Sequence, residues 1–552
     1  MGPITVPMAS NRCAIPKRSN PQITSTIPGA INVLRFACGV GAILSAVSSP
    51  VVIAQTAAPV GGSASRFEPQ ISIRESYTDN VGLVRGDAKK SEFITEISPG
   101  FSIFSRGARA NFDVNYSINT LFYYRDNDRN TLNHQLRANG AAELAEDWVF
   151  LESRANISQQ AVSAFGPIGS NSSTSNNKQT LRSFSVSPYL RHAFGRQATA
   201  EARYTYSKQS TNGGSTSVSD SESNSVLLKV DSGPAYQDWG WGTAYSREQI
   251  NYERSVDSTF ENWTGSLRYR INPRLFAVGT FGYDRNDYFT VGDNPQGAFW
   301  SIGGDWRPGR RTALNFSAGR RYFGATYAVS ANHATQRTTW DFSYQRNLTT
   351  SRSQVDQPFG STIRDQEENR YRADNPGKTE QEVKDAVRPI LQQYINSNVD
   401  PDSVAGINFQ TNTAFVEKKF QGVVSVQLPK TRLSFTAFDS VRDASTLNTV
   451  TVFNRSGDFA LSNVIKQSGV SGQVTYRLSA RNDANLGLDY SRVRLIDISR
   501  TDSLSSFNLG ISRKLSHTAN GSLGYRFIRR DSNFDANDYD ENAFFGSLNL
   551  TF

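Results

Sequence analysis

Residues 109–124 read RANFDVNYSINTLFYY, and this stretch decides the fold. Most residues at its odd-numbered positions up to Asn119 are polar. The alternate positions are apolar, aromatic or Thr: Phe112, Val114, Tyr116, Ile118, Thr120, Phe122 and Tyr124. A period of two over this length predicts a strand with one apolar and one polar face. The stretch is long enough to cross a bilayer at a tilt, which takes about 9–11 residues.

The same alternation recurs along the 552-residue chain and predicts 21 clear strands. A short further strand at residues 350–355 would make the count even, as in bacterial single-chain barrels. Hydrophobic content of 37% and a mean hydropathy of −0.49 exclude a helical membrane protein, which needs about 20 apolar residues per span. The predicted fold is all-β: a large antiparallel transmembrane β-barrel of about 22 strands, within a range of roughly 16–24, with one helical loop insertion.

The N-terminus has the features of a secretory signal peptide over residues 1–54. Four basic residues (Arg12, Lys17, Arg18 and Arg35) and no acidic residue precede an apolar run at residues 36–53, which ends in small residues. An uncleaved helical anchor is the alternative. A short linker is expected at residues 55–66 and the outer-membrane barrel at residues 67–552. Only about ten residues would separate cleavage from the first strand, which argues against a TonB-dependent receptor with an N-terminal plug.

Both cysteines, Cys13 and Cys38, lie in the predicted leader, so the mature chain would contain no disulfide or thiolate metal site. Cleavage would also remove four of the 59 basic residues, which leaves 55 against 50 acidic residues and a net charge of +5. This modest excess indicates a tendency toward anionic solutes. It does not indicate nucleic-acid binding, because no basic run or nucleic-acid motif is present.

Short and long connections alternate between the predicted strands. In outer-membrane barrels the tight turns are periplasmic and the long loops extracellular. By this parity an insert at residues 356–412 is expected outside the cell. Within it, residues 376–398 carry an apolar stripe at helical spacing: Val383, Val387, Ile390, Leu391, Tyr394 and Ile395. This helix would pack on the barrel rim, fold into the mouth or bind another protein.

The last strand ends on the final residue of the chain. One of its faces carries Phe544, Gly546, Leu548, Leu550 and Phe552, which resembles the C-terminal signal read by the barrel-assembly machinery. The alternative is an edge strand of a soluble β-sandwich. That alternative must also explain some twenty two-faced strands and a signal peptide.

The polar strand faces are expected to line a water-filled lumen. The candidate lumen-facing residues are Asp113, Asn115, Asn119, Arg137 and Glu143. No catalytic, cofactor or metal site is predicted, because His residues at metal-ligand spacing and nucleophile motifs are missing. His134 faces the lipid side in the predicted strand and is the only candidate for a lipid-modifying enzyme. Acidic residues at Asp439 and Asp443, and at Asp535, Asp538 and Asp540, are solvated loop faces or, alternatively, sites for Ca²⁺ that bridges lipopolysaccharide.

Three short motifs add a resemblance to a known family. They are residues 75–81 (ESYTDNV), 97–100 (ISPG) and 121–124 (LFYY), and residues 349–353 (TTSRS) fit the same pattern. With these the chain resembles the PEP-CTERM/exosortase system-associated outer-membrane proteins, a group of β-barrel porins. The resemblance implies an association with exopolysaccharide production and surface sorting in Gram-negative bacteria, and it carries over no catalytic residue.

Together these observations lead to a functional hypothesis: a non-enzymatic, porin-like conduit or export component of the outer membrane. Its expected partners are outer-membrane lipid and lipopolysaccharide, the barrel-assembly machinery, and exopolysaccharide or its export proteins. Two alternatives stay open. One is a non-conducting barrel that anchors an export complex, and the other is the lipid-modifying enzyme centred on His134.

Overall fold

The structure, a computed structural model, describes residues 64–212, 220–288, 295–356, 411–444, 457–534 and 537–552. It also describes the single positions Arg364, Glu367, Glu368, Tyr371, Val383, Ala386, Val387, Leu391 and Phe409. The predicted signal peptide, residues 1–54, lies outside the described residues. The first strand begins at Ala64, so the last three residues of the expected linker belong to the barrel.

Twenty-two strands make up most of the described chain. They are β1 (Ala64–Thr78), β2 (Glu92–Arg106), β3 (Ala110–Tyr123), β4 (Thr131–Ala145), β5 (Val149–Ala161), β6 (Lys178–Phe194), β7 (Ala198–Asn212), β8 (Ser221–Ser232), β9 (Trp239–Tyr252), β10 (Ser258–Asn272), β11 (Leu275–Asp287), β12 (Gln296–Gly309), β13 (Thr312–Arg321), β14 (Gly324–Ala334), β15 (Thr338–Thr349), β16 (Phe415–Gln427), β17 (Thr431–Asp443), β18 (Val464–Arg477), β19 (Asn482–Leu495), β20 (Arg500–Lys514), β21 (Ala519–Ser532) and β22 (Tyr539–Thr551).

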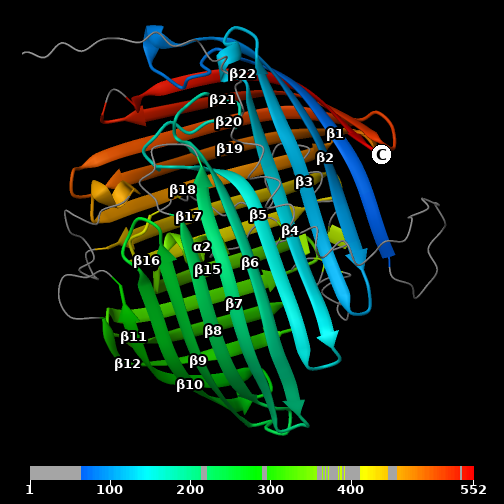
Figure 1. Ribbon diagram of the computed structural model, residues 1–552. Coiled ribbons are helices and arrows are strands. Elements are labelled where there is room, and N and C mark those ends of the chain that lie inside the picture. The colour runs from blue at the N-terminus through cyan, green and yellow to red at the C-terminus, as the bar shows by residue number, and fades with distance from the viewer. Residues whose placement is uncertain are drawn as a thin grey trace, which may run out of the picture. The chain divides into compact units, whose positions relative to one another are not determined.

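Each strand pairs antiparallel with the next in sequence, and the last strand pairs with the first. The closing pair runs from Gln70 opposite Thr551 to Thr78 opposite Ala543. Beyond the strand, the Phe552 amide donates to the Pro69 carbonyl at 2.9 Å. Figure 1 shows β1 and β22 side by side at the seam. Closure leaves no strand edge unpaired. The predicted fold class and strand number are therefore confirmed.

One strand lies elsewhere than predicted. Residues 350–355 do not form a strand: they lie within the helix α2 (Ser351–Asp356). The twenty-second strand is β14, which pairs with β13 and β15. Its sequence, GATYAVSANHA, was missed because its outer face carries small residues beside Tyr327 and Val329. Only two residues separate β13 from β14. Gly324, the first residue of β14, has a positive φ of 107°, a conformation that glycine adopts without steric cost.

The outer wall is apolar and aromatic, as a lipid-facing surface requires. Side chains such as Trp263, Leu267, Ile302, Leu509 and Leu523 are 45–71% exposed although they lie within strands. With the closed barrel, this outer wall places the protein in the outer membrane. Among the described residues, no helix is long and apolar enough to cross a membrane.

Parts of the predicted helical insert are described. Val383, Ala386, Val387 and Leu391 are helical. Val383, Val387 and Leu391 are 0–2% exposed and pack with Tyr371, so the apolar stripe is buried at these three positions. Ile390, Tyr394 and Ile395 lie outside the described residues. The insert follows β15, at the same end of the barrel as the long loops.

Candidate functional site

Hydroxyl and amide side chains line the middle of the inner wall. Inner positions alternate along each strand with exposed residues of the outer face. On β20, Asn508 adjoins Leu509, which is 47% exposed; on β10, Ser266 adjoins Leu267, which is 53% exposed. Such a wall offers many neutral hydrogen-bonding groups to hydrated solutes.

The five candidate lumen residues occupy inner positions of β3 and β4. Asp113, Asn115 and Asn119 alternate with the outer residues Phe112 and Phe122, which are 42% and 44% exposed. Asn115 donates to Asp113 Oδ1 at 2.6 Å and accepts from Ser102 Oγ at 2.7 Å. Arg137 lies opposite Asn115 in the β3–β4 register. Glu143 accepts a hydrogen bond from the Asp147 amide at 2.6 Å, in the turn after β4. Their part in conduction stays a prediction.

The loop between β5 and β6, residues 162–177, folds across the mouth of the lumen. Its Ala164 and Phe165 are 1% and 4% exposed. They belong to an apolar cluster with residues from the opposite part of the wall and from other loops, here called the mouth cluster: Ala164, Phe165, Phe409, Phe415, Ala444, Phe459, Ile465, Val493 and Leu495. The lumen is therefore filled by packed side chains at the end that carries the long loops.

The mouth cluster was not predicted from the sequence. A uniformly polar inner face was expected, but inner positions near the loop ends of several strands are apolar and buried, among them Leu121, Ile250, Ile465, Val493 and Leu495. The signal was present in the sequence. Toward the loop end of β19 the alternation changes to Val493 and Leu495 on the inner face. Such a change marks the depth to which loops fill the barrel.

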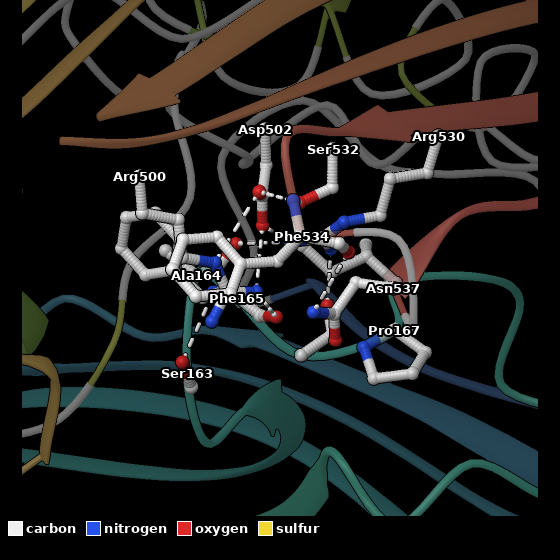
Figure 2. A network of polar contacts seen from close by, with 12 residues as sticks. Ser163, Ala164, Phe165, Pro167, Arg500, Asp502, Arg530, Ser532, Phe534 and Asn537 are labelled. Atoms are coloured by element: carbon white, nitrogen blue, oxygen red, sulfur yellow. Dashed lines mark hydrogen bonds and ion pairs between the residues drawn. The ribbon is translucent and has the colours of Figure 1, made fainter. Parts of the chain in front are cut away.

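Hydrogen bonds from charged side chains hold the 162–177 loop against the inner wall (Figure 2). Arg500 of β20 donates to the Phe165 carbonyl at 2.9 Å. Arg530 of β21 donates to the carbonyls of Ala164, at 3.4 Å, and Gly166. Asp502 bridges both guanidinium groups. The side chains of Asp502 and Arg530 are 3% and 2% exposed, so this ion pair is inaccessible to water while the loop is in place.

A second set of contacts comes from the loop side. Asp458, in the 3-10 helix η4 (Gly457–Ala460), accepts hydrogen bonds from the Ser163 hydroxyl and from the Ala164 amide, the latter at 2.8 Å. Burial raises the pKa of the Asp458 carboxyl above its usual value. The Tyr539 hydroxyl donates to the Ile168 carbonyl at 2.7 Å. We call Asp458, Arg500, Asp502, Arg530 and Tyr539 the loop latch.

The helix α2 makes a separate tether across the lumen. It follows β15, yet its Arg352 donates to the carbonyls of Ser207 on β7, at 2.9 Å, and Ser221 on β8, at 3.2 Å. The Arg352 side chain also contacts both serine hydroxyls at 2.5 Å and is buried. On its own side of the barrel, Gln354 donates to Glu417 of β16 at 2.7 Å. Figure 1 shows the α2 label among the strands of the barrel. The root of the insert is therefore fixed to two distant parts of the wall.

A cavity of about 360 Å³ lies where residues 168–170 of the loop meet the wall of β18 to β22. Polar side chains that line it include Gln473, Asn485, Asp489, Asn508 and Arg526. Asp489 already accepts from Ser471 at 2.5 Å and from Ser506 at 2.8 Å. The cavity is thus formed jointly by the loop and the inner wall.

His134, Asp538 and Asp540 have structural partners. The His134 ring lies on the outer face and shares a 2.7 Å hydrogen bond between its Nδ1 and the Tyr116 hydroxyl. Asp540 pairs with Lys89 at 2.6 Å, and Asp538 accepts from the Ser532 amide at 2.6 Å. Asp535 lies outside the described residues. Within the described part of the chain, no group of three or more His, Cys, Asp or Glu side chains could hold a metal ion.

Comparison with known proteins gives structural similarity alone. No family model and no curated protein matches the sequence. The barrel is similar to the siderophore receptor PirA from Pseudomonas aeruginosa, with a TM-score of 0.42, 10% identity and coverage of 88% of this chain and 80% of that one.

It is also similar to a variant of the ferric enterobactin receptor PfeA from Pseudomonas aeruginosa in complex with enterobactin. The TM-score is 0.44 and the identity 9%, over 89% and 82% of the two chains. The FrpB iron transporter from Neisseria meningitidis is similar with a TM-score of 0.35 and 10% identity, over 88% of this chain and 82% of that one. These similarities concern the barrel fold alone.

Proposed function

We propose that this outer-membrane barrel is a gated conduit for polar solutes, closed at its long-loop end by the 162–177 loop and by α2. The observation that carries the proposal is the combination of a polar inner wall and a closure made of segments that belong to no strand. The inner wall is rich in hydroxyl and amide groups, whereas the closure consists of two chain segments held by the loop latch and by Arg352. A barrel that never conducts needs no hydrated wall beneath its closure.

The finer part of the proposal is the biological process. The conduit serves the export of exopolysaccharide in association with PEP-CTERM/exosortase surface sorting. This part is supported by the resemblance carried by residues 75–81, 97–100 and 121–124.

A second candidate is a barrel that anchors an export complex without conducting. The mouth cluster favours it, because its nine members are 0–4% exposed and pack as a permanent core would. In that case the polar inner wall would face a solvated interior through which no solute passes.

Single-channel conductance in planar bilayers distinguishes the two candidates. The mature protein, the form without residues 357–410 and the variant Arg352→Ala are compared after heat-modifiable gel mobility confirms folding. The conduit predicts rare openings of the intact protein and frequent, larger steps of both variants. If none of the three folded forms conducts, the conduit is wrong and the anchoring barrel is the better candidate.

A further inference from the structure

The short-turn end of the barrel carries positive charge on one side. Four turns, those between β12 and β13, β14 and β15, β16 and β17, and β18 and β19, contain no acidic residue. Six basic side chains lie in or beside them, here called the basic arc: Arg307, Arg310, Arg311, Arg337, Lys430 and Arg481. All six residues are exposed, and none forms an ion pair with an acidic side chain of the described residues.

The other side of the same rim is balanced. Its turns, from β2 to β9, carry Arg109 and Arg196 against Glu146, Asp147 and Asp238. Arg109 pairs with Glu146 at 2.7 Å. The positive charge of the rim is therefore concentrated in one arc and is not a general property of the turns.

The arc reaches the inner face of the wall at Arg307, which adjoins Trp306, 45% exposed on the outer face of β12. Two further arginines lie on the inner face of β10, between the arc and the balanced turns. Arg268 and Arg270 alternate with Leu267, Tyr269 and Ile271, which are 44–55% exposed on the outer face, so both arginines lie on the inner face of β10. The Arg268 guanidinium lies 3.7 Å from the centre of the Phe276 ring. Arg270 lies 4.0 Å from Asp238.

This distribution discriminates between possible anionic ligands. Lipid headgroups surround a barrel on all sides, so a headgroup site has no reason to occupy one arc and to continue inward. A folded acidic protein would contact the turns but would not reach side chains inside the wall. A flexible polyanion contacts both, because a chain that passes over the rim continues along the inner face.

We propose that the basic arc is where an anionic polysaccharide, a sugar chain that carries carboxylate groups, binds before it passes into the lumen. The hydroxyl and amide groups in the middle of the inner wall favour a sugar chain over an acidic polypeptide, because they present donors and acceptors to its hydroxyl groups. The proposal rests on the proposed conduit for its purpose, but the binding step itself needs no conduction.

The physical basis is summed charge at an exposed surface. Each pair of exposed charges contributes little on its own, whereas several like charges beside a pore raise the local concentration of an oppositely charged chain. Binding should therefore weaken steeply as salt rises.

Binding is tested with fluorescently labelled polygalacturonate and the mature, refolded barrel. The variant Arg310→Glu/Arg311→Glu removes two positive charges from the arc and adds two negative ones. Its matched control is Arg109→Glu/Arg196→Glu, which makes the same change in net charge on the other side of the rim. Neutral dextran and poly-L-glutamate are the comparison ligands, and heat-modifiable mobility reports folding of each variant.

We expect polygalacturonate to bind the unmodified protein in low salt and to bind Arg310→Glu/Arg311→Glu roughly tenfold more weakly or worse. The control variant should stay within about twofold, and dextran should not bind. Equal weakening by both variants, or binding of dextran, would overturn the arc as the site. Poly-L-glutamate binding as tightly as polygalacturonate would overturn the ligand class. If no conductance is seen in bilayers but polygalacturonate binding still depends on the arc, the proposed conduit is wrong and the binding site stands.

Discussion

At the scale of single residues, the buried pair Arg530 and Asp502 is the most sensitive point of the loop latch. Its charges are 2–3% exposed; they compensate each other, and Arg530 also donates hydrogen bonds to the loop carbonyls. Removal of one partner leaves a buried charge without compensation.

We expect Arg530→Met to lower the free energy of unfolding by about 3–5 kcal/mol, measured by urea unfolding in lipid vesicles. The adjacent Arg529 provides the control, because its ion pair with Asp531 is exposed, with side chains 61% and 58% accessible. Arg529→Met should leave the unfolding midpoint essentially where it is. Equal effects of the two substitutions would mean that Arg530 is not buried by the loop.

Asp458 gives the closure a dependence on pH. Its pKa in the closed state is raised by burial above the usual 3.8, so the closed state binds a proton more readily than the open state. The contribution of Asp458 to closure therefore grows as the pH falls from neutral toward about 4, and it declines as the pH rises through the elevated pKa. The charged groups that face the carboxyl are Arg442 and Arg500, and both oppose the shift.

Amide hydrogen exchange of residues 162–177, corrected for the intrinsic exchange rate, measures this effect. The unmodified protein should gain protection in this loop between neutral and mildly acidic pH, and Asp458→Asn should show no such gain. A gain of the same size in Asp458→Asn would assign the pH dependence to another group.

At the scale of elements, α2 depends on Arg352 for its attachment to the β7–β8 wall. Arg352 makes four contacts with Ser207 and Ser221, and hydrogen bonds to a charged group contribute about 1.5–3 kcal/mol each. Loss of this guanidinium should free α2 from the β7–β8 wall without affecting the strand ladder.

We expect spin labels at Ser353→Cys and Ser225→Cys to give one narrow distance distribution in the unmodified background, and a broad one with Arg352→Ala. The mature chain makes this measurement direct, because both native cysteines lie in the predicted leader. Arg137→Ala, a substitution in the lumen on β4, is the control and should keep the narrow distribution. A narrow distribution in Arg352→Ala would show that α2 is held by something other than Arg352.

At the scale of the whole molecule, an added charge should destabilise the barrel much more on the outer face of the wall than on the inner face. Leu509 lies near the middle of β20 on the outer face and is 47% exposed, while the adjacent Asn508 lines the cavity on the inner face. An arginine at the lipid midplane costs about 2–4 kcal/mol.

Leu509→Arg should therefore lower the free energy of unfolding in vesicles by about this amount, and Asn508→Arg by much less. Both substitutions introduce the same side chain at adjacent positions of one strand. A larger effect from Asn508→Arg would contradict the assignment of faces throughout the barrel.

The sequence by itself determined the barrel. The alternation in residues 109–124, repeated along the chain, predicts membrane-spanning strands because period-two patterning is a local property of each segment. The strand number also followed, from 21 clear strands and the even count typical of bacterial single-chain barrels. The location of one strand did not. The small outer residues of β14 weaken its pattern, and α2 has no periodicity long enough to read.

Only the tertiary structure decided that the mouth is closed. The loop latch and the Arg352 tether join loop and wall segments that are 131–371 positions apart in sequence, and the mouth cluster likewise joins distant strands and loops. Such contacts depend on which strands face each other across a closed barrel, and no local pattern encodes that. The basic arc is also a product of tertiary structure: its six basic residues lie in or beside four separate turns, and they form one surface because consecutive antiparallel pairing of β12 to β19 places those turns next to one another on one rim.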